Sequence, residues 1–215
     1  MTKPMKIDFV SDISCPWCAI GLHALERALT EVAGEISAEL HFQPFELNPQ
    51  MPPEGQDIDE HIAQKYGSTP EQMAQSRETI RRRGEEVGFV FGQRSRIYNT
   101  FDAHRLLHWA EQQGRQRELQ HALFEAYFTR GASPGDHGVL LAAAEAVGLD
   151  RDRAAAMLAS NEYAQEVRER ERFYLDAGIH SVPSVIINDR HLIQGGQPAQ
   201  VFAQALRQIA AGSPQ

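Results

Sequence analysis

The sequence is poor in cysteine, in basic charge and in long apolar runs. Its 215 residues include two cysteines, and 29 acidic residues outnumber 21 Lys and Arg, which gives a formal net charge of −8 at pH 7. No segment approaches the roughly 18 uninterrupted apolar residues of a membrane span. The charge also lacks the basic excess typical of nucleic-acid-binding domains. We therefore expect neither a membrane nor a nucleic acid among its partners.

The N-terminus lacks the features of a secretory signal. The segment M-T-K-P-M-K-I-D-F-V passes directly into a strand-like stretch, without the apolar run of about 7–15 residues that such a signal contains. We expect a cytoplasmic protein on this basis. Because that compartment keeps thiols reduced, a purely structural disulfide is not expected, and a bridge across so short a loop would add little stability.

What the chain does contain is the pattern of a mixed α/β domain at its two ends. With 42% hydrophobic residues, its length suits one sizeable core, or one domain that carries a second subdomain. Strands are indicated by short apolar or β-branched runs, and helices by apolar residues at helical spacing. The predicted elements at the two ends are a strand at 7–10, a helix at 15–32, a strand at 38–47 interrupted near Pro44, strands at 184–187 and 191–194, and a helix at 198–211.

The middle of the chain is predominantly helical. Capping-box starts occur at Asp57 to Glu60 and at Thr69 to Gln72. Further helices are predicted at 100–113, 116–129, 136–147, 150–159 and 161–177. The sequence thus predicts an α/β fold of order β-α-β, then β-β-α, formed by residues 1–55 and 178–215, with a large inserted helical subdomain at 56–177.

The two cysteines, Cys15 and Cys18, lie three positions apart at the start of the first predicted helix. Residues at i and i+3 share one helix face, so the two sulfurs can approach disulfide distance. The positive end of the helix favours a thiolate and would lower the pKa of Cys15 from about 8.5, which suits thiol–disulfide exchange. Cys18, one turn deeper, would be the resolving thiol. Between them, Pro16 and Trp17 are the residues expected to tune the redox potential, and a nearby Asp12 would oppose thiolate formation if it faced the sulfur.

A metal site and incidental packing remain alternatives for this pair. Zinc needs four ligands, so the others would have to be histidines. His104 and His108 have the i, i+4 spacing to supply them. Their simpler interpretation is the polar edge of the helix at 100–113.

A second feature is Val182-Pro183, immediately before the strand at 184–187. An X-Pro bond is usually trans. A cis bond here would expose the backbone of Val182, whose N–H and C=O could pair with an extended substrate as a strand pairs with a sheet edge.

Together these features resemble the DsbA family of thioredoxin-fold oxidoreductases, most of all its FrnE-like branch. Related members are the 2-hydroxychromene-2-carboxylate isomerases and the kappa-class glutathione transferases. The segments that carry the resemblance are 8–18 with Gly21, 42–49, 99–107 and 178–184. The resemblance implies a thioredoxin-like fold with a helical lid, a redox-active disulfide at Cys15 and Cys18, and a cis Val182-Pro183 bond packed against it.

The resulting hypothesis is a cytoplasmic thiol–disulfide oxidoreductase or isomerase that acts on disulfide-containing polypeptides or small thiols. Cys15 attacks, Cys18 resolves, and Val182-Pro183 positions the partner backbone. No bound cofactor or metal is expected, glutathione is a candidate redox partner, and the apolar helical insertion could support a homodimer.

Two other functions stay open. One is a glutathione-dependent isomerase or transferase, in which Ser11, Ser14 or Cys15 would contact the glutathione sulfur; the related enzymes are similar in layout but carry serine where this chain has Cys15. The other is a zinc-stabilised or chaperone-like binding module.

The proton acceptor for Cys18 is a further prediction. Thioredoxin-like sites often place an acidic group beneath the buried cysteine, and the candidates here are Asp8, Asp12 and Glu46. We favour Glu46, because the second strand is expected to run under the active-site helix.

Overall fold

A four-stranded sheet with the order β2-β1-β5-β6 forms the centre of the computed structural model, which describes residues 2–212. Strand β1 (Lys3–Ser11) runs parallel to β2 (Ile36–Pro44) and antiparallel to β5 (Ser184–Ile187), and β6 (His191–Gln194) returns antiparallel to β5. The central strand is apolar on both faces because both are covered, and its Ile7, Phe9 and Val10 are fully buried. This arrangement confirms the thioredoxin-like fold that the resemblance implied.

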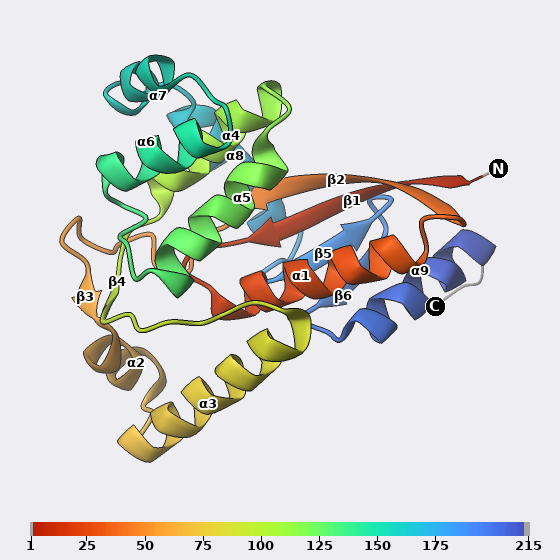
Figure 1. Ribbon diagram of the computed structural model, residues 1–215, viewed down its shortest axis with the longest axis horizontal. Helices are drawn as coiled ribbons and strands as arrows, with labels where there is room; N and C mark the ends of the chain where they lie inside the picture. Colours follow the sequence, from red (N-terminus) through yellow and green to blue (C-terminus); the bar gives the residue numbers. More distant parts are fainter. Residues whose placement is uncertain (1, 213–215) are drawn as a thin grey trace.

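Helix α1 (Pro16–Glu31) connects β1 to β2 and carries the cysteine pair at its start. Pro16 occupies the first turn, where a missing backbone N–H removes no intrahelical hydrogen bond. Cys18, Leu22 and Leu25 recur on one face and are fully buried. Helix α9 (Ala199–Ala211) lies beside α1 (Figure 1).

The insertion between β2 and β5 consists mainly of helices. Its elements are α2 (Ile58–Tyr66), α3 (Pro70–Val87), α4 (Phe101–Gln112), α5 (Gln116–Phe124), the π-helical turn η1 (Glu125–Thr129), α6 (His137–Ala146), α7 (Arg151–Leu158) and α8 (Ala164–Asp176). Figure 1 shows α4 to α7 grouped on one side of α1, with α2 and α3 on the other. The side chain of Asp57 caps α2, and Thr69 with Gln72 forms the capping box of α3, so both predicted helix starts are confirmed.

Strand β1 is longer than the predicted 7–10, since it begins at Lys3 and ends at Ser11. Three further details differ from the sequence prediction. Residues 116–129 form α5 and then a π-helical turn rather than one α-helix. Two strands of two residues each, β3 (Gln56–Asp57) and β4 (Arg96–Ile97), pair within the insertion. Strand β2 ends at Pro44 instead of reaching residue 47, because the backbone N–H of Leu47 turns away to donate to the carboxylate of Asp12 at 2.7 Å.

The main apolar core extends from the sheet into the insertion without a break. It includes Leu22 and Leu25 of α1 together with Leu106, Leu123 and Phe128 of the insertion. None of the helices within residues 2–212 is long and apolar enough to cross a membrane.

Candidate active site

The cysteine pair lies where β1 ends and α1 begins. Cys15 is the N-cap residue of α1, and its own N–H donates to the carbonyl of Asp12 at 3.1 Å. The N–H of Cys18 donates to the carbonyl of Cys15 at 3.0 Å, so both side chains belong to the first turn. Both are free thiols; Cys15 is 4% exposed and Cys18 is fully buried. Cys15 is therefore the outer sulfur and Cys18 the inner one.

The Val182–Pro183 segment faces Cys15 from the other end of the chain. Its peptide bond is cis, and the Cys15 Sγ lies 3.7 Å from the carbonyl oxygen of Val182. Gly21 of α1 permits this approach, because a Cβ there would meet Cγ of Pro183 at 3.0 Å. The structure thus brings together the two motifs that the sequence separates by 167 positions.

The inner thiol is held in its protonated form by its surroundings. Burial raises the pKa of Cys18 well above its usual value, and the neighbouring Cys15 and the charge of Asp12 raise it further. The backbone of Asp12 opposes this shift in part. Cys18 must therefore lose a proton before it can act as a nucleophile.

Asp12 is the fully buried centre of a hydrogen-bond cluster directly behind the cysteine loop. Its Oδ2 accepts from the hydroxyl of Ser14 and the backbone N–H of Leu47, both at 2.7 Å. Its Oδ1 accepts from the hydroxyl of Thr100 at 2.7 Å and from the N–H of Ser14 at 3.2 Å. These bonds tie the loop before Cys15 to the segment after β2 and to the start of α4.

His104 of α4 completes the cluster. Its Nε2 lies 3.5 Å from Oδ1 of Asp12, and both side chains are buried. Burial alone would raise the pKa of Asp12, but the neighbouring His104, together with the hydrogen bonds from Leu47 and Ser14, lowers it. Burial alone would lower the pKa of His104, but Asp12 outweighs it and raises the pKa. Both shifts favour the charged forms, a carboxylate at Asp12 and an imidazolium at His104.

The prediction that His104 lies at the polar edge of its helix is wrong, because its side chain points to Asp12 in the core. His108 is half-buried, with its ring 5.0 Å from that of Tyr163. Within residues 2–212 no group of three or more His, Cys, Asp or Glu side chains is arranged to hold a metal.

Glu46 and Asp8 lie elsewhere. Because β2 ends at Pro44, Glu46 belongs to the following loop, where its buried carboxylate pairs with Arg168 of α8. Burial and the nearby Glu171 raise the pKa of Glu46. Asp8 pairs with Lys6 at 3.0 Å. Of the three acidic candidates, Asp12 is the one whose charge raises the pKa of Cys18. The role predicted for Glu46 stays a prediction.

Trp17, between the cysteines, is half-buried and forms one wall of a groove of about 520 Å³. The other wall comes from the end of α2 and from α3. The lining residues are Trp17, Tyr66, Ser68, Gln72, Gln75, Ser76, Thr79 and Ile80. This groove and the Asp12 cluster were missed in the sequence, although Asp12 and Ser14 have the spacing of an Asx turn.

Comparison with known proteins agrees with this geometry. Residues 6–207 match the family described as the DSBA-like thioredoxin domain. A probable DsbA oxidoreductase from Streptomyces coelicolor is 32% identical, with a TM-score of 0.89 over 98% of this chain and 92% of that one.

Two more distant structures share the fold at 17% identity. One is a 2-hydroxychromene-2-carboxylate isomerase, with a TM-score of 0.69 over 97% of this chain and 100% of that one. The other is the cytosolic disulfide reductase DsbM from Pseudomonas aeruginosa with GSH, with a TM-score of 0.65 over 95% of this chain and 98% of that one.

Proposed function

The chain belongs to the DSBA-like thioredoxin domain family, and on that premise we propose that it is a thiol–disulfide oxidoreductase whose Cys15–Cys18 pair exchanges electrons with disulfides. The observation that carries the proposal is the position of Cys15, which caps a helix and faces the carbonyl of Val182 while Cys18 lies buried one turn deeper. A helix N-terminus favours negative charge, and the thiolate is the form in which cysteine attacks.

The exchange has two steps. The Cys15 sulfur attacks one sulfur of the substrate disulfide, and the other substrate sulfur leaves as a thiolate. Cys18 then attacks the Cys15 sulfur of the mixed disulfide and expels the second substrate thiolate. The substrate gains two electrons, and the protein becomes the Cys15–Cys18 disulfide. In the oxidising direction the same steps run in reverse.

The backbone at Val182 is the proposed docking point for the substrate chain. Its carbonyl lies beside the Cys15 sulfur, and an extended peptide can pair with exposed backbone N–H and C=O groups as an added strand. Such pairing would hold a substrate cysteine next to Cys15 through backbone hydrogen bonds, which do not depend on the side chains of the substrate.

The proton of Cys18 needs an acceptor in the second step. Asp12 is one candidate, because its charge acts on the Cys18 thiol, but its lowered pKa makes it a weaker proton acceptor than an ordinary carboxylate. Glu46, the candidate favoured from sequence, pairs with Arg168 instead, so its role would require a rearrangement of that pair.

We also propose that the protein acts in the cytoplasm, that glutathione is its redox partner and that it forms a homodimer. The name of the related DsbM structure supports the first two by analogy of fold. A glutathione-dependent isomerase is the less favoured alternative, since this chain has kept both cysteines.

The test is reduction of insulin, and of a small fluorogenic disulfide, by the wild type and by Cys15→Ser and Cys18→Ser. We expect Cys15→Ser to be inactive, because it lacks the attacking sulfur. Cys18→Ser should stop at the mixed disulfide, visible by mass spectrometry of the intact protein. Activity that survives Cys15→Ser would overturn the mechanism. Isomerisation of a hydroxychromene carboxylate that is unaffected by Cys18→Ser would favour the isomerase.

A further inference from the structure

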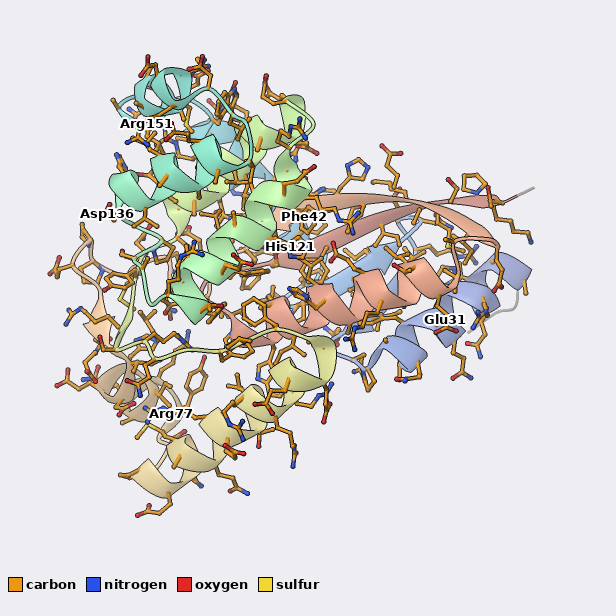
Figure 2. The ribbon with its side chains drawn as sticks, in the orientation of Figure 1. Glu31, Phe42, Arg77, His121, Asp136 and Arg151 are labelled. Atoms are coloured by element: carbon orange, nitrogen blue, oxygen red, sulfur yellow. The ribbon has the colours of Figure 1, made fainter. Side chains whose placement is uncertain are left out.

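A small cavity lies behind the active site, where β2 meets α4 and α5 of the insertion. Its volume is about 10 Å³, which is room for a single water molecule. Phe42 lines it from β2, and Figure 2 shows this residue beside α5. Ser11, the residue before Asp12, lines it as well. The cavity therefore reaches the end of the strand that leads into the cysteine loop.

Three polar side chains that line this cavity have a buried atom without a hydrogen-bond partner. Within residues 2–212 these atoms are Nε2 of His104, Nδ1 of His108 and Oε1 of Gln120. His104 is 3% exposed and Gln120 is fully buried. Buried polar atoms are normally paired with protein or with water, and a buried water makes about three hydrogen bonds. The composition of the cavity wall thus fits one bound water.

His104 connects the cavity to the cluster behind the cysteines. Its ring lines the cavity and also faces Asp12, with Nε2 3.5 Å from Oδ1. Asp12 in turn accepts from the N–H and the hydroxyl of Ser14, and its carbonyl accepts from the N–H of Cys15. A continuous set of polar contacts therefore leads from the cysteine loop to the cavity.

His108 connects the cavity to the surface. It follows His104 by four residues, so both lie on one face of α4. The half-buried ring of His108 lines the cavity and also an open groove of about 520 Å³, and Gln43 and Arg170 are common to both. Burial lowers the pKa of His108, and the charge of Arg170 lowers it further. The ring is therefore neutral near pH 7 and can accept a proton.

We propose, on the basis of the function proposed above, that the cavity holds a water molecule bonded to Gln120 and to the rings of His104 and His108, and that this water and His108 carry the proton released by Cys18 from the Asp12–His104 pair to solvent. Because the pKa of Asp12 is lowered, a proton that reaches its carboxylate has to be passed on. His104 and His108 are positioning residues in this route, since they act through Asp12 and the water and do not touch the reacting sulfurs.

The route adds no reactant to the exchange. In the resolution step the Cys18 sulfur bonds to the Cys15 sulfur, and the substrate leaves with the electron pair of its former bond to Cys15. The proton of Cys18 enters the Asp12–His104 pair, while one proton of the His104 ring passes to the water and through His108 to solvent. The pair keeps its number of protons, and the substrate thiolate takes up a proton from solvent.

A second set of acidic groups faces His104. Glu46, from the segment after β2, and Glu171, from α8, both raise the pKa of His104. Both carboxylates pair with Arg168, and each has a buried Oε1 without a partner. These carboxylates offer the other way out for a proton, and the experiment has to separate them from the cavity.

The experiment measures resolution separately from attack, by stopped-flow fluorescence with a fluorogenic peptide disulfide in excess over the reduced protein. The rate of attack rises with peptide concentration, whereas the rate of resolution does not. His108→Ala removes the outlet, and Gln120→Leu removes a partner of the water. His137→Ala is the matched control, because His137 is exposed at the start of α6 and does not line the cavity.

We expect His108→Ala to slow resolution by about tenfold, a smaller loss than that of a general base that touches the reacting atom, and to leave attack unchanged. Imidazole in the buffer should restore the rate, because the open groove gives it access to the place of the missing ring. Gln120→Leu should slow resolution by a similar factor without rescue by imidazole, and His137→Ala should change neither step. A crystal structure of the reduced wild type should show a water within hydrogen-bond distance of Gln120 and His108.

Resolution at the wild-type rate in His108→Ala, or a loss that imidazole does not restore, would overturn the route. A cavity without water in the crystal structure would overturn the water site. Slow resolution in Glu46→Gln, with His108→Ala unaffected, would assign the proton exit to Glu46 and Glu171. A failure of the proposed function looks different, since the wild type would then form no mixed disulfide at Cys15. Matching melting temperatures would establish that folding is not the cause, and if His108→Ala does not fold, Gln120→Leu and the wild-type crystal structure still test the proposal.

Discussion

At the scale of single residues, the buried Asp12–His104 pair couples stability to pH. Asp12 has a pKa below its ordinary 3.8, so it contributes stability above pH 3.8 that is lost as the pH falls through its lower folded value. His104 has a pKa above its ordinary 6.5, so it contributes stability below pH 6.5 that is lost as the pH rises through its higher folded value. The pair therefore stabilises the fold most between these two ordinary values.

We expect His104→Gln to lower the free energy of unfolding by about 3 kcal/mol at pH 5, the cost of leaving a buried charge without its partner. The loss should shrink as the pH rises through the raised pKa of His104, because the wild-type imidazole then becomes neutral as well. Urea unfolding followed by circular dichroism at pH 5, 7 and 9 measures it. Besides Asp12, the acidic side chains of Glu171 and Glu46 raise the pKa of His104. The charge states of these three carboxyl groups therefore affect the pH at which His104 titrates.

Substitution of the exposed His180 by Gln is the matched control, and its effect should be small and the same at all three pH values. An equal loss for His104→Gln at pH 5 and pH 9 would mean that His104 is uncharged in the folded protein.

The sequence located the reacting residues better than the residues that support them. Cys15 and Cys18 could be placed because spacing and helix start are local features. Asp12, Thr100 and His104 could not be joined, because their contact spans 88 or more positions and depends on how α4 packs. Glu46 was favoured on the assumption that β2 continues past Pro44, and the chain leaves the sheet there.

At the scale of elements, the contact between α1 and the Val182–Pro183 segment depends on a glycine. A Cβ at Gly21 would lie 3.0 Å from Cγ of Pro183 and 3.4 Å from Cα of Gly196. The first distance is tighter than ordinary van der Waals contact, the second lies at its lower limit, and Pro183 is buried. The helix that carries the cysteines can therefore approach Pro183 only without a side chain at this position.

We expect Gly21→Ala to lower the free energy of unfolding by about 1–3 kcal/mol, the usual cost of overpacking a filled core, despite the higher helix propensity of alanine. The activity should fall as well, because Val182 is displaced from Cys15. Urea unfolding and insulin reduction measure the two effects. Gly34→Ala is the control, since a Cβ there meets nothing within 4 Å; equal stability of the two variants would contradict the packing argument.

Some element boundaries followed from the sequence where a cap or a β-branched run marked them, but β1 extends beyond its predicted run, from Lys3 to Ser11. Strands 184–187 and 191–194 were placed at their observed bounds. The pair of β3 and β4 was missed, since two residues are too few to show an alternating pattern. The π-helical turn after Phe124 was missed as well, because its apolar spacing resembles that of an α-helix.

At the scale of the whole molecule, the insertion and the α/β part share one core and one sheet edge. The side chain of Gln116 on α5 accepts from the N–H of Phe42 and donates to its carbonyl, each at 3.0 Å. It thereby satisfies the free edge of β2 as a neighbouring strand would. Figure 2 shows Phe42 on β2 beside α5.

Because the core is continuous, we expect both parts to unfold in a single transition. One tryptophan lies in each: Trp17 in α1 and Trp109 in α4. Trp109→Phe leaves a fluorescence probe in the α/β part, and Trp17→Phe leaves one in the insertion. Within each variant, the fluorescence transition in urea should coincide with the one seen by circular dichroism.

Adding Gln116→Ala should lower the unfolding free energy reported by both probes by the same amount, about 1–3 kcal/mol for a buried backbone N–H and C=O left unpaired. Gln113→Ala, exposed three residues away, should leave both unchanged. A shift of the Trp109 transition alone would show that the insertion unfolds independently, and the shared edge would then contribute nothing to the stability of the sheet.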